Sequence, residues 1–139
     1  MVGEERARRL LTELLGSISD LERYRQSVTR EELRASRDRQ HMVLHALYVA
    51  TQSALDLAMH LGADAGLPQA ETYQDAFRRL GEAGWLDADQ VERLAAWAGF
   101  RNVLARFYAT VDYDRVFDAL SEVSDLERFA AIVSSKLGD

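Results

Sequence analysis

One stretch of this chain repeats its apolar residues at steps of four and three, which is the spacing of a single helix face. Its members are Val43, Leu47, Ala50, Ala54, Leu57 and Leu61. Such residues align on one side of an α-helix, because the helix completes a turn about every 3.6 residues. A continuous apolar side must be buried against other elements. We therefore predict a long core helix that is capped by Ser36 and extends to His60 or Leu61.

The rest of the chain also favours helices, because it contains a single Pro and no convincing run of alternating β-branched residues. An apolar stripe from Leu10 to Leu21 predicts the first helix. Thr29 and Glu32 have the spacing of a capping box, in which each side chain accepts a hydrogen bond from the backbone of the other residue. This box predicts a short second helix that ends at about Ala35.

Further helices are predicted after a loop at residues 62–69, where Gly62 is a candidate C-terminal cap and Pro68 ends the regular structure. These helices cover residues 70–83, residues 87 to about 110, and a last segment that Asp112 caps. Asp87 and Gln90 have the spacing of a second capping box, which starts the helix at residue 87. A length of 139 residues fits one domain with one sizeable core. The prediction is an all-α, single-domain helical bundle of about five helices over residues 1–139.

Composition excludes several kinds of site. The chain has no Cys, so we expect no disulfide, no thiolate nucleophile and no Cys-based zinc site. Its net charge of −6 argues against a general nucleic-acid coat protein. No apolar run approaches the roughly 20 residues that span a bilayer, and Glu4 and Glu5 stand where a signal peptide would be apolar. We therefore expect a cytoplasmic protein that binds neither membranes nor DNA.

Charged residues occur in the segment from Arg101 to Tyr108, which otherwise has the apolar composition of a core helix. Its sequence is Arg-Asn-Val-Leu-Ala-Arg-Phe-Tyr. On a helix these residues share their arc with the small residues Ala95, Ala98, Gly99 and Ala105. Small residues let another backbone approach closely. We expect this arc to pack on a helix of the same chain or of a second copy, with Arg101 and Arg106 in the seam. The alternative is that Arg101 pairs with a carboxylate and that Tyr108 is a core residue.

This segment and the following Ala-Thr-Val-Asp-Tyr-Asp-Arg-Val resemble the signature of HepT-like toxins, which belong to the HEPN superfamily of helical proteins. The family pattern is an Arg, often followed by Asn, then a short spacer, a His, one further residue and a Tyr. The resemblance extends over most of the chain. It includes Thr72–Phe77, the Gly84–Leu86 turn, Ala98–Asn102, and Gln52–Ala58 before His60.

The resemblance implies a toxin that cuts RNA, as reported for tRNA, without a metal or another cofactor. Such toxins act as homodimers whose motif lines a cleft between the subunits. Their partner is a nucleotidyltransferase antitoxin of the MntA type, which adds AMP to the motif Tyr. By this resemblance Arg101 corresponds to the motif Arg, Asn102 to its polar neighbour and Tyr108 to the modified Tyr.

The motif His is absent, because Arg106 stands in its position. Metal-free RNA cleavage needs a group that accepts and donates protons near neutral pH, as His does. Arg cannot act as a base, although it can hold a phosphate or stabilise a pentavalent intermediate. Three explanations are open: an inactive relative that still binds RNA or its partner, an inactivating change, or another group that replaces the His.

The candidates for a replacing group are His41, His45 and His60. His41 and His45 are four residues apart on one helix face, a spacing that also suits a metal pair. Met42 follows His41 where a zincin motif has Glu, so we predict no metal site. The alternative is that these are partly buried helix residues without a catalytic role.

Weaker signals suggest RNA contacts outside the motif. Trp97 would stack on a base, or else lie in the core or a dimer interface. Arg37 and Arg39, together with Arg34, would follow a phosphate backbone, or else form a solvated face paired with neighbouring acids.

The predicted function is an RNA endonuclease of the toxin family, with Arg101, Asn102, Arg106 and Tyr108 as site residues and a degenerate motif. One alternative is a non-catalytic binding module that dimerises and serves as scaffold or substrate for a nucleotidyltransferase. A purely structural dimerisation bundle is the other.

Overall fold

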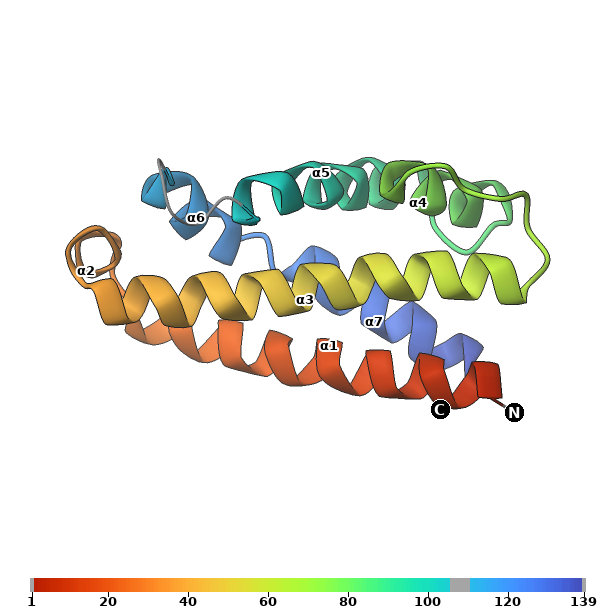
Figure 1. The fold of residues 1–139 in the computed structure, drawn as a ribbon, viewed down its shortest axis with the longest axis horizontal. Helices are drawn as coiled ribbons and strands as arrows, with labels where there is room; N and C mark the ends of the chain where they lie inside the picture. The colour runs from red at the N-terminus through yellow and green to blue at the C-terminus, as the bar shows by residue number, and fades with distance from the viewer. Residues whose placement is uncertain (1, 106–110, 139) are drawn as a thin grey trace.

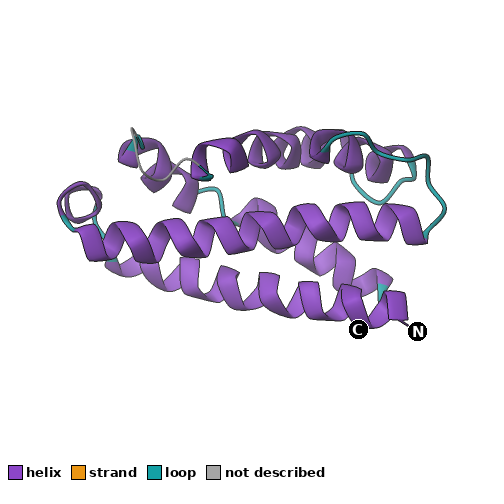
Figure 2. Ribbon diagram, in the orientation of Figure 1, coloured by secondary structure: helices purple, strands orange, loops and turns teal. Residues whose placement is uncertain are grey.

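The computed structural model describes residues 2–105 and 111–138, and these residues form seven helices and no strand (Figure 2). The helices are α1 (Val2–Ser27), α2 (Arg30–Ala35), α3 (Arg37–Asp64), α4 (Tyr73–Glu82), α5 (Ala88–Leu104), α6 (Tyr113–Leu120) and α7 (Ser124–Lys136). The predicted all-α class is confirmed. The number of helices exceeds the expected total of about five, because the short α2 is a helix of its own and the predicted last helix is divided into α6 and α7.

The long helix α3 lies in the middle of the bundle (Figure 1). It packs against α1 on one side and against α4 and α5 on the other, while α7 crosses behind it. The short helices α2 and α6 contact each other at one end of the molecule. Both chain ends lie at the opposite end, where the Arg8 guanidinium donates a hydrogen bond to the Leu137 carbonyl at 2.6 Å.

The predicted core helix is confirmed by the burial of its apolar stripe. All six residues of the stripe, from Val43 to Leu61, are at most 5% exposed. The hydroxyl of Thr51, which is also buried, donates to the Leu47 carbonyl at 2.6 Å and so brings no unpaired polar atom into the core. By length and composition α3 could also cross a bilayer, but 61% of its most apolar window is buried in the bundle, as in the core helix of a globular domain.

The predicted caps at the helix starts are also observed. Thr29 forms its capping box with Glu32, and Asp87 forms one with Gln90. Ser36 accepts a hydrogen bond from the Arg39 backbone and thereby starts α3 directly after α2. Each such cap satisfies an N–H group that the helix leaves unpaired, and contributes about 1 kcal/mol.

Several predicted boundaries are wrong. Helix α3 passes through Gly62 to Asp64, and the chain turns at Gly66, whose positive φ of 72° suits a residue without Cβ. Helix α4 begins after its cap Thr72 rather than at residue 70. The last helix is interrupted at residues 121–123, and its two halves share only part of their partners: α6 packs on α2 and α1, and α7 packs on α1, α3 and α5.

Candidate functional site

Arg101 lies in the last turn of α5 and reaches α3. Its Nε donates a hydrogen bond to Oε1 of Gln52 at 3.0 Å. The amide nitrogen of Gln52 in turn donates to Asp56 at 2.9 Å and to the Tyr73 hydroxyl at 3.2 Å. All four side chains are half-buried. They form a polar cluster that joins α3, α4 and α5, and we call it the Arg101 cluster.

Among the described residues, the Arg101 cluster provides no direct counterion for the arginine charge. Gln52 is neutral, and no carboxylate among the described residues forms an ion pair with Arg101. The carboxylate of Asp56 binds the far side of Gln52 instead. The alternative that Arg101 pairs with a carboxylate is therefore not observed within residues 2–105 and 111–138. A guanidinium held in this way is positioned and still able to bind an anion through its remaining donors.

The small-residue arc of α5 is only partly covered. Ala98 is buried within the bundle, whereas Asn102 and Ala105 are exposed. A Cβ added to Gly99 would meet no atom of the described residues within 4 Å, apart from the backbone of its own helix. The expected close packing on a helix of the same chain is therefore absent at Gly99, and this part of α5 is open on the described surface.

Arg106 and Tyr108, the second half of the predicted motif, lie outside the described residues. The structure describes the chain up to Ala105 and again from Val111, two residues before α6 begins. Asp112 caps α6 by accepting hydrogen bonds from the backbone of Asp114 and Arg115.

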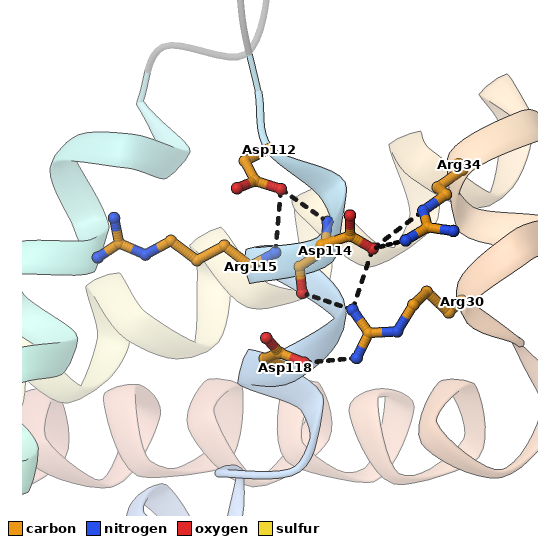
Figure 3. A network of polar contacts seen from close by, with 6 residues as sticks. All are labelled: Arg30, Arg34, Asp112, Asp114, Arg115 and Asp118. Atoms are coloured by element: carbon orange, nitrogen blue, oxygen red, sulfur yellow. Dashed lines mark hydrogen bonds and ion pairs between the residues drawn. The ribbon is translucent and has the colours of Figure 1, made fainter.

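Helix α6 is fixed by an ion-pair network with α2 (Figure 3). Arg30 binds Asp114 at 3.0 Å and Asp118 at 2.6 Å, and Arg34 binds Asp114 at 2.6 Å. Arg30 also lies over the Phe117 ring at 4.7 Å from its centre. Hydrogen bonds from Arg30 and then Arg34 lower the pKa of the Asp114 carboxyl. The network thus fixes the start of α6, which follows the motif in the sequence.

The three histidines have different surroundings. His41 and His45 are exposed and line a pocket of about 270 Å³ with Leu44 and Tyr113. His60 lies near the other end of α3, where its Nε2 is 2.7 Å from the carbonyl oxygen of Gly3. No group of three His, Asp or Glu residues in the described parts of the chain is placed to hold a metal ion.

Trp97 lies in the core, since it is 5% exposed. Its indole nitrogen donates to Asp125 at 3.2 Å, and its ring packs edge-on against Phe100. The bond joins α5 to α7, and Arg128 pairs with the same buried carboxylate at 2.9 Å. This environment favours the core interpretation of Trp97 over stacking on a base.

The predicted arginine cluster of α2 and α3 is divided among different roles. Arg34 pairs with Asp114, and Arg39 pairs with Glu32 at 3.1 Å. Arg37 is exposed and forms no ion pair with the described part of the chain. Arg37 therefore retains the charge that a phosphate contact would use.

The sequence profile of the family described as Ribonuclease HepT-like matches residues 14–133. This chain belongs to that family. A curated relative of this HepT-like protein is the tRNA nuclease HepT of Aphanizomenon flos-aquae (strain 2012/KM1/D3). The two are 27% identical over 109 residues, which are 78% of this chain and 74% of the relative.

Solved structures of similar shape agree with the HepT-like fold. One is a tri-AMPylated HEPN toxin of Shewanella oneidensis in complex with an MNT antitoxin, with a TM-score of 0.82 and 16% identity over 94% of this chain and 97% of that one. Another is YutE of Bacillus subtilis, a cytosolic protein of unknown function, with a TM-score of 0.77 and 15% identity over 94% and 90%. At this identity the likeness concerns the fold.

The sequence did not identify the residues that position Arg101 in this HepT-like protein. Gln52, Asp56 and Tyr73 carry no motif chemistry of their own and come from helices distant in the chain. The one available signal was that all three lie in the segments that resemble the family, around residues 52–58 and 72–77.

Proposed function

We propose that this HepT-like protein is the toxin of a toxin–antitoxin pair and cleaves cytoplasmic RNA without a metal ion. The observation that carries the proposal is the binding of Arg101 by the neutral Gln52, which orients the guanidinium and leaves it free of a carboxylate partner among the described residues. In this proposal Arg101 binds a backbone phosphate beside the cleaved bond, and Asn102 orients it. The tRNA nuclease HepT relative supports tRNA as the substrate class.

Arg106 has a different role from the motif His that it replaces. A guanidinium remains protonated, so Arg106 would bind phosphate or stabilise the charged intermediate rather than transfer a proton. We expect Arg106→His to increase RNA cleavage, because it would supply the acid–base group that the motif lacks. Cleavage no faster than that of the parent would argue against a degenerate ribonuclease motif.

The first experiment compares cleavage of total tRNA by the parent protein, Arg101→Ala and Arg23→Ala on denaturing gels. Arg23 is the control, since it is an exposed arginine that pairs with Asp20 within α1, far from the cluster in the chain. The parent and Arg23→Ala should cleave, and Arg101→Ala should lose at least about a hundredfold in rate. No cleavage by the parent, or equal cleavage by Arg101→Ala, would contradict the proposal.

The open face of α5 supports a homodimer in which a second copy packs over Gly99. We expect Gly99→Arg to convert a dimer to a monomer in light-scattering measurements, because a long charged side chain would separate the two helices. Gly16→Arg is the matched control, since Gly16 is an exposed helical glycine of α1. A Cβ added there would also meet no described atom within 4 Å outside its own helix backbone. A dimer that survives Gly99→Arg would place the interface elsewhere.

A second candidate function is that of a non-catalytic substrate and scaffold for an MntA-type nucleotidyltransferase. The absent motif His favours it, as does the solved neighbour, which is AMPylated and bound to an MNT antitoxin. It predicts that co-expression with such an enzyme adds adenylyl groups, that Tyr108→Phe removes one of them, and that no RNA is cut. An unmodified intact mass would count against it.

A further inference from the structure

The pocket between the first turns of α3 and the start of α6 brings together two of the three histidines of the chain. His41, Leu44 and His45 line it from α3, and Tyr113 lines it from α6. Its volume of about 270 Å³ exceeds the roughly 30 Å³ that one water molecule occupies. Leu44 is 4% exposed, whereas both histidines are exposed and thus accessible to a ligand from solvent.

Both walls of this pocket are held by the fold. His41 and His45 lie one turn apart on α3, so their Cβ atoms are about 5–6 Å apart. The opposite side of this helix is the central core stripe. Tyr113 is the first residue of α6, which the Asp112 cap and the ion pairs of Asp114 with α2 fix in place. The two imidazoles are therefore presented side by side by rigid elements.

The same side of α3 carries the residue that positions Arg101. Gln52 follows His45 by seven residues, which is two helical turns and about 10 Å along the axis. At the other end Arg37 precedes His41 by one turn and has no ion pair with the described residues. One face of α3 thus presents the guanidinium of Arg37, the two imidazoles and Gln52, which holds Arg101. Positive groups at such intervals suit binding to a phosphate backbone.

We propose that His41 and His45 perform the proton transfers of RNA cleavage that the absent motif His would otherwise perform. This inference rests on the proposed ribonuclease function. Imidazole is suited to the task, since it exchanges a proton near neutral pH and Arg106 cannot. Arg101 binds the strand at a neighbouring phosphate, because Gln52, which holds it, lies about two helical turns from His45 along α3.

In this reaction one imidazole accepts the proton of the ribose 2′-hydroxyl, and the 2′-oxygen forms a bond to phosphorus. The bond from phosphorus to the 5′-oxygen of the next nucleotide breaks, and the other imidazole donates a proton to that oxygen. The products are a 2′,3′-cyclic phosphate and a 5′-hydroxyl. Proton exchange with water returns both imidazoles to their starting states.

The test measures cleavage rates and product ends for His41→Ala, His45→Ala and the control His60→Ala. His60 lies about 22 Å from His45 along α3 and binds Gly3, so its loss should leave cleavage unchanged. Each pocket variant should cut at least about a hundredfold more slowly, and binding of uncleavable 2′-O-methyl RNA should persist. The parent should leave 2′,3′-cyclic phosphate ends.

A rescue variant separates a role in proton transfer from a role in folding. Adding Arg106→His to His41→Ala should restore cleavage if the pocket replaces the motif His. If the parent and His60→Ala cut while both pocket variants cut within about twofold of the parent, the inference fails and the proposed ribonuclease stands. If the parent does not cut at all, the proposed ribonuclease fails and the inference fails with it.

Discussion

Arg101 differs from Arg30 and Arg34 in the charge of its partner. Arg30 and Arg34 bind carboxylates of α6, which neutralise them, whereas Arg101 binds the amide oxygen of Gln52. An amide fixes the direction of a guanidinium without cancelling its charge. The identity of residue 52 therefore decides whether the guanidinium of Arg101 is neutralised by its partner or keeps its charge.

This distinction predicts that Gln52→Glu weakens RNA binding, although a glutamate oxygen still accepts from Arg101 and the change also replaces the donor to Asp56 with a second carboxylate oxygen. The new carboxylate would compete with phosphate for the guanidinium, and a charge-assisted contact contributes roughly 1.5–3 kcal/mol, so affinity should fall about tenfold or more. Fluorescence anisotropy with 2′-O-methyl RNA measures this. Gln26→Glu, on the exposed surface of α1, adds the same charge and should have little effect. Equal losses for both variants would indicate general repulsion instead.

Helix α6 depends on its neighbours for its stability. It has eight residues, and isolated helices shorter than about 12 residues are barely stable in water. The Asp112 cap, the α2 ion pairs and the contact of Arg30 with Phe117 compensate for this shortness. Helix α6 carries Tyr113 and follows the motif in the sequence. The ion pairs that hold α6 on α2 therefore also hold Tyr113 in position.

Arg30→Ala should lower the thermal stability of the protein at neutral pH and much less in acid. The arginines lower the folded pKa of Asp114, so this carboxyl stabilises the fold above its unfolded pKa of about 3.9. The contribution is lost as the pH falls through the lower, folded pKa. The difference in melting temperature between parent and variant should therefore shrink towards acidic pH. Arg23→Ala, which breaks a pair within α1, should cause a smaller loss, and a pH-independent difference would contradict the argument.

The periodic and local features of this fold are predictable from the sequence, whereas its long-range contacts are not. The stripe from Val43 to Leu61 and the capping boxes follow from residues a few positions apart. The bond from Arg101 to Gln52 depends on how α5 crosses α3, which no local spacing encodes. The pocket of His41 likewise needs Tyr113 from α6, although the sequence named that histidine as a candidate.

The central position of α3 predicts that the chain unfolds as one unit. Leu47 is fully buried in the core stripe, and α1, α2, α4, α5 and α7 all contact its helix. Leu47→Ala should therefore lower the free energy of unfolding by about 2–5 kcal/mol through lost burial and the remaining cavity. Leu15→Ala is the control, because Leu15 is 48% exposed on α1 and should cost far less. Denaturant unfolding followed by circular dichroism and by tryptophan fluorescence should give coincident transitions for both variants. Two separate transitions would contradict the single domain predicted for residues 1–139, because a core shared through α3 cannot unfold in halves.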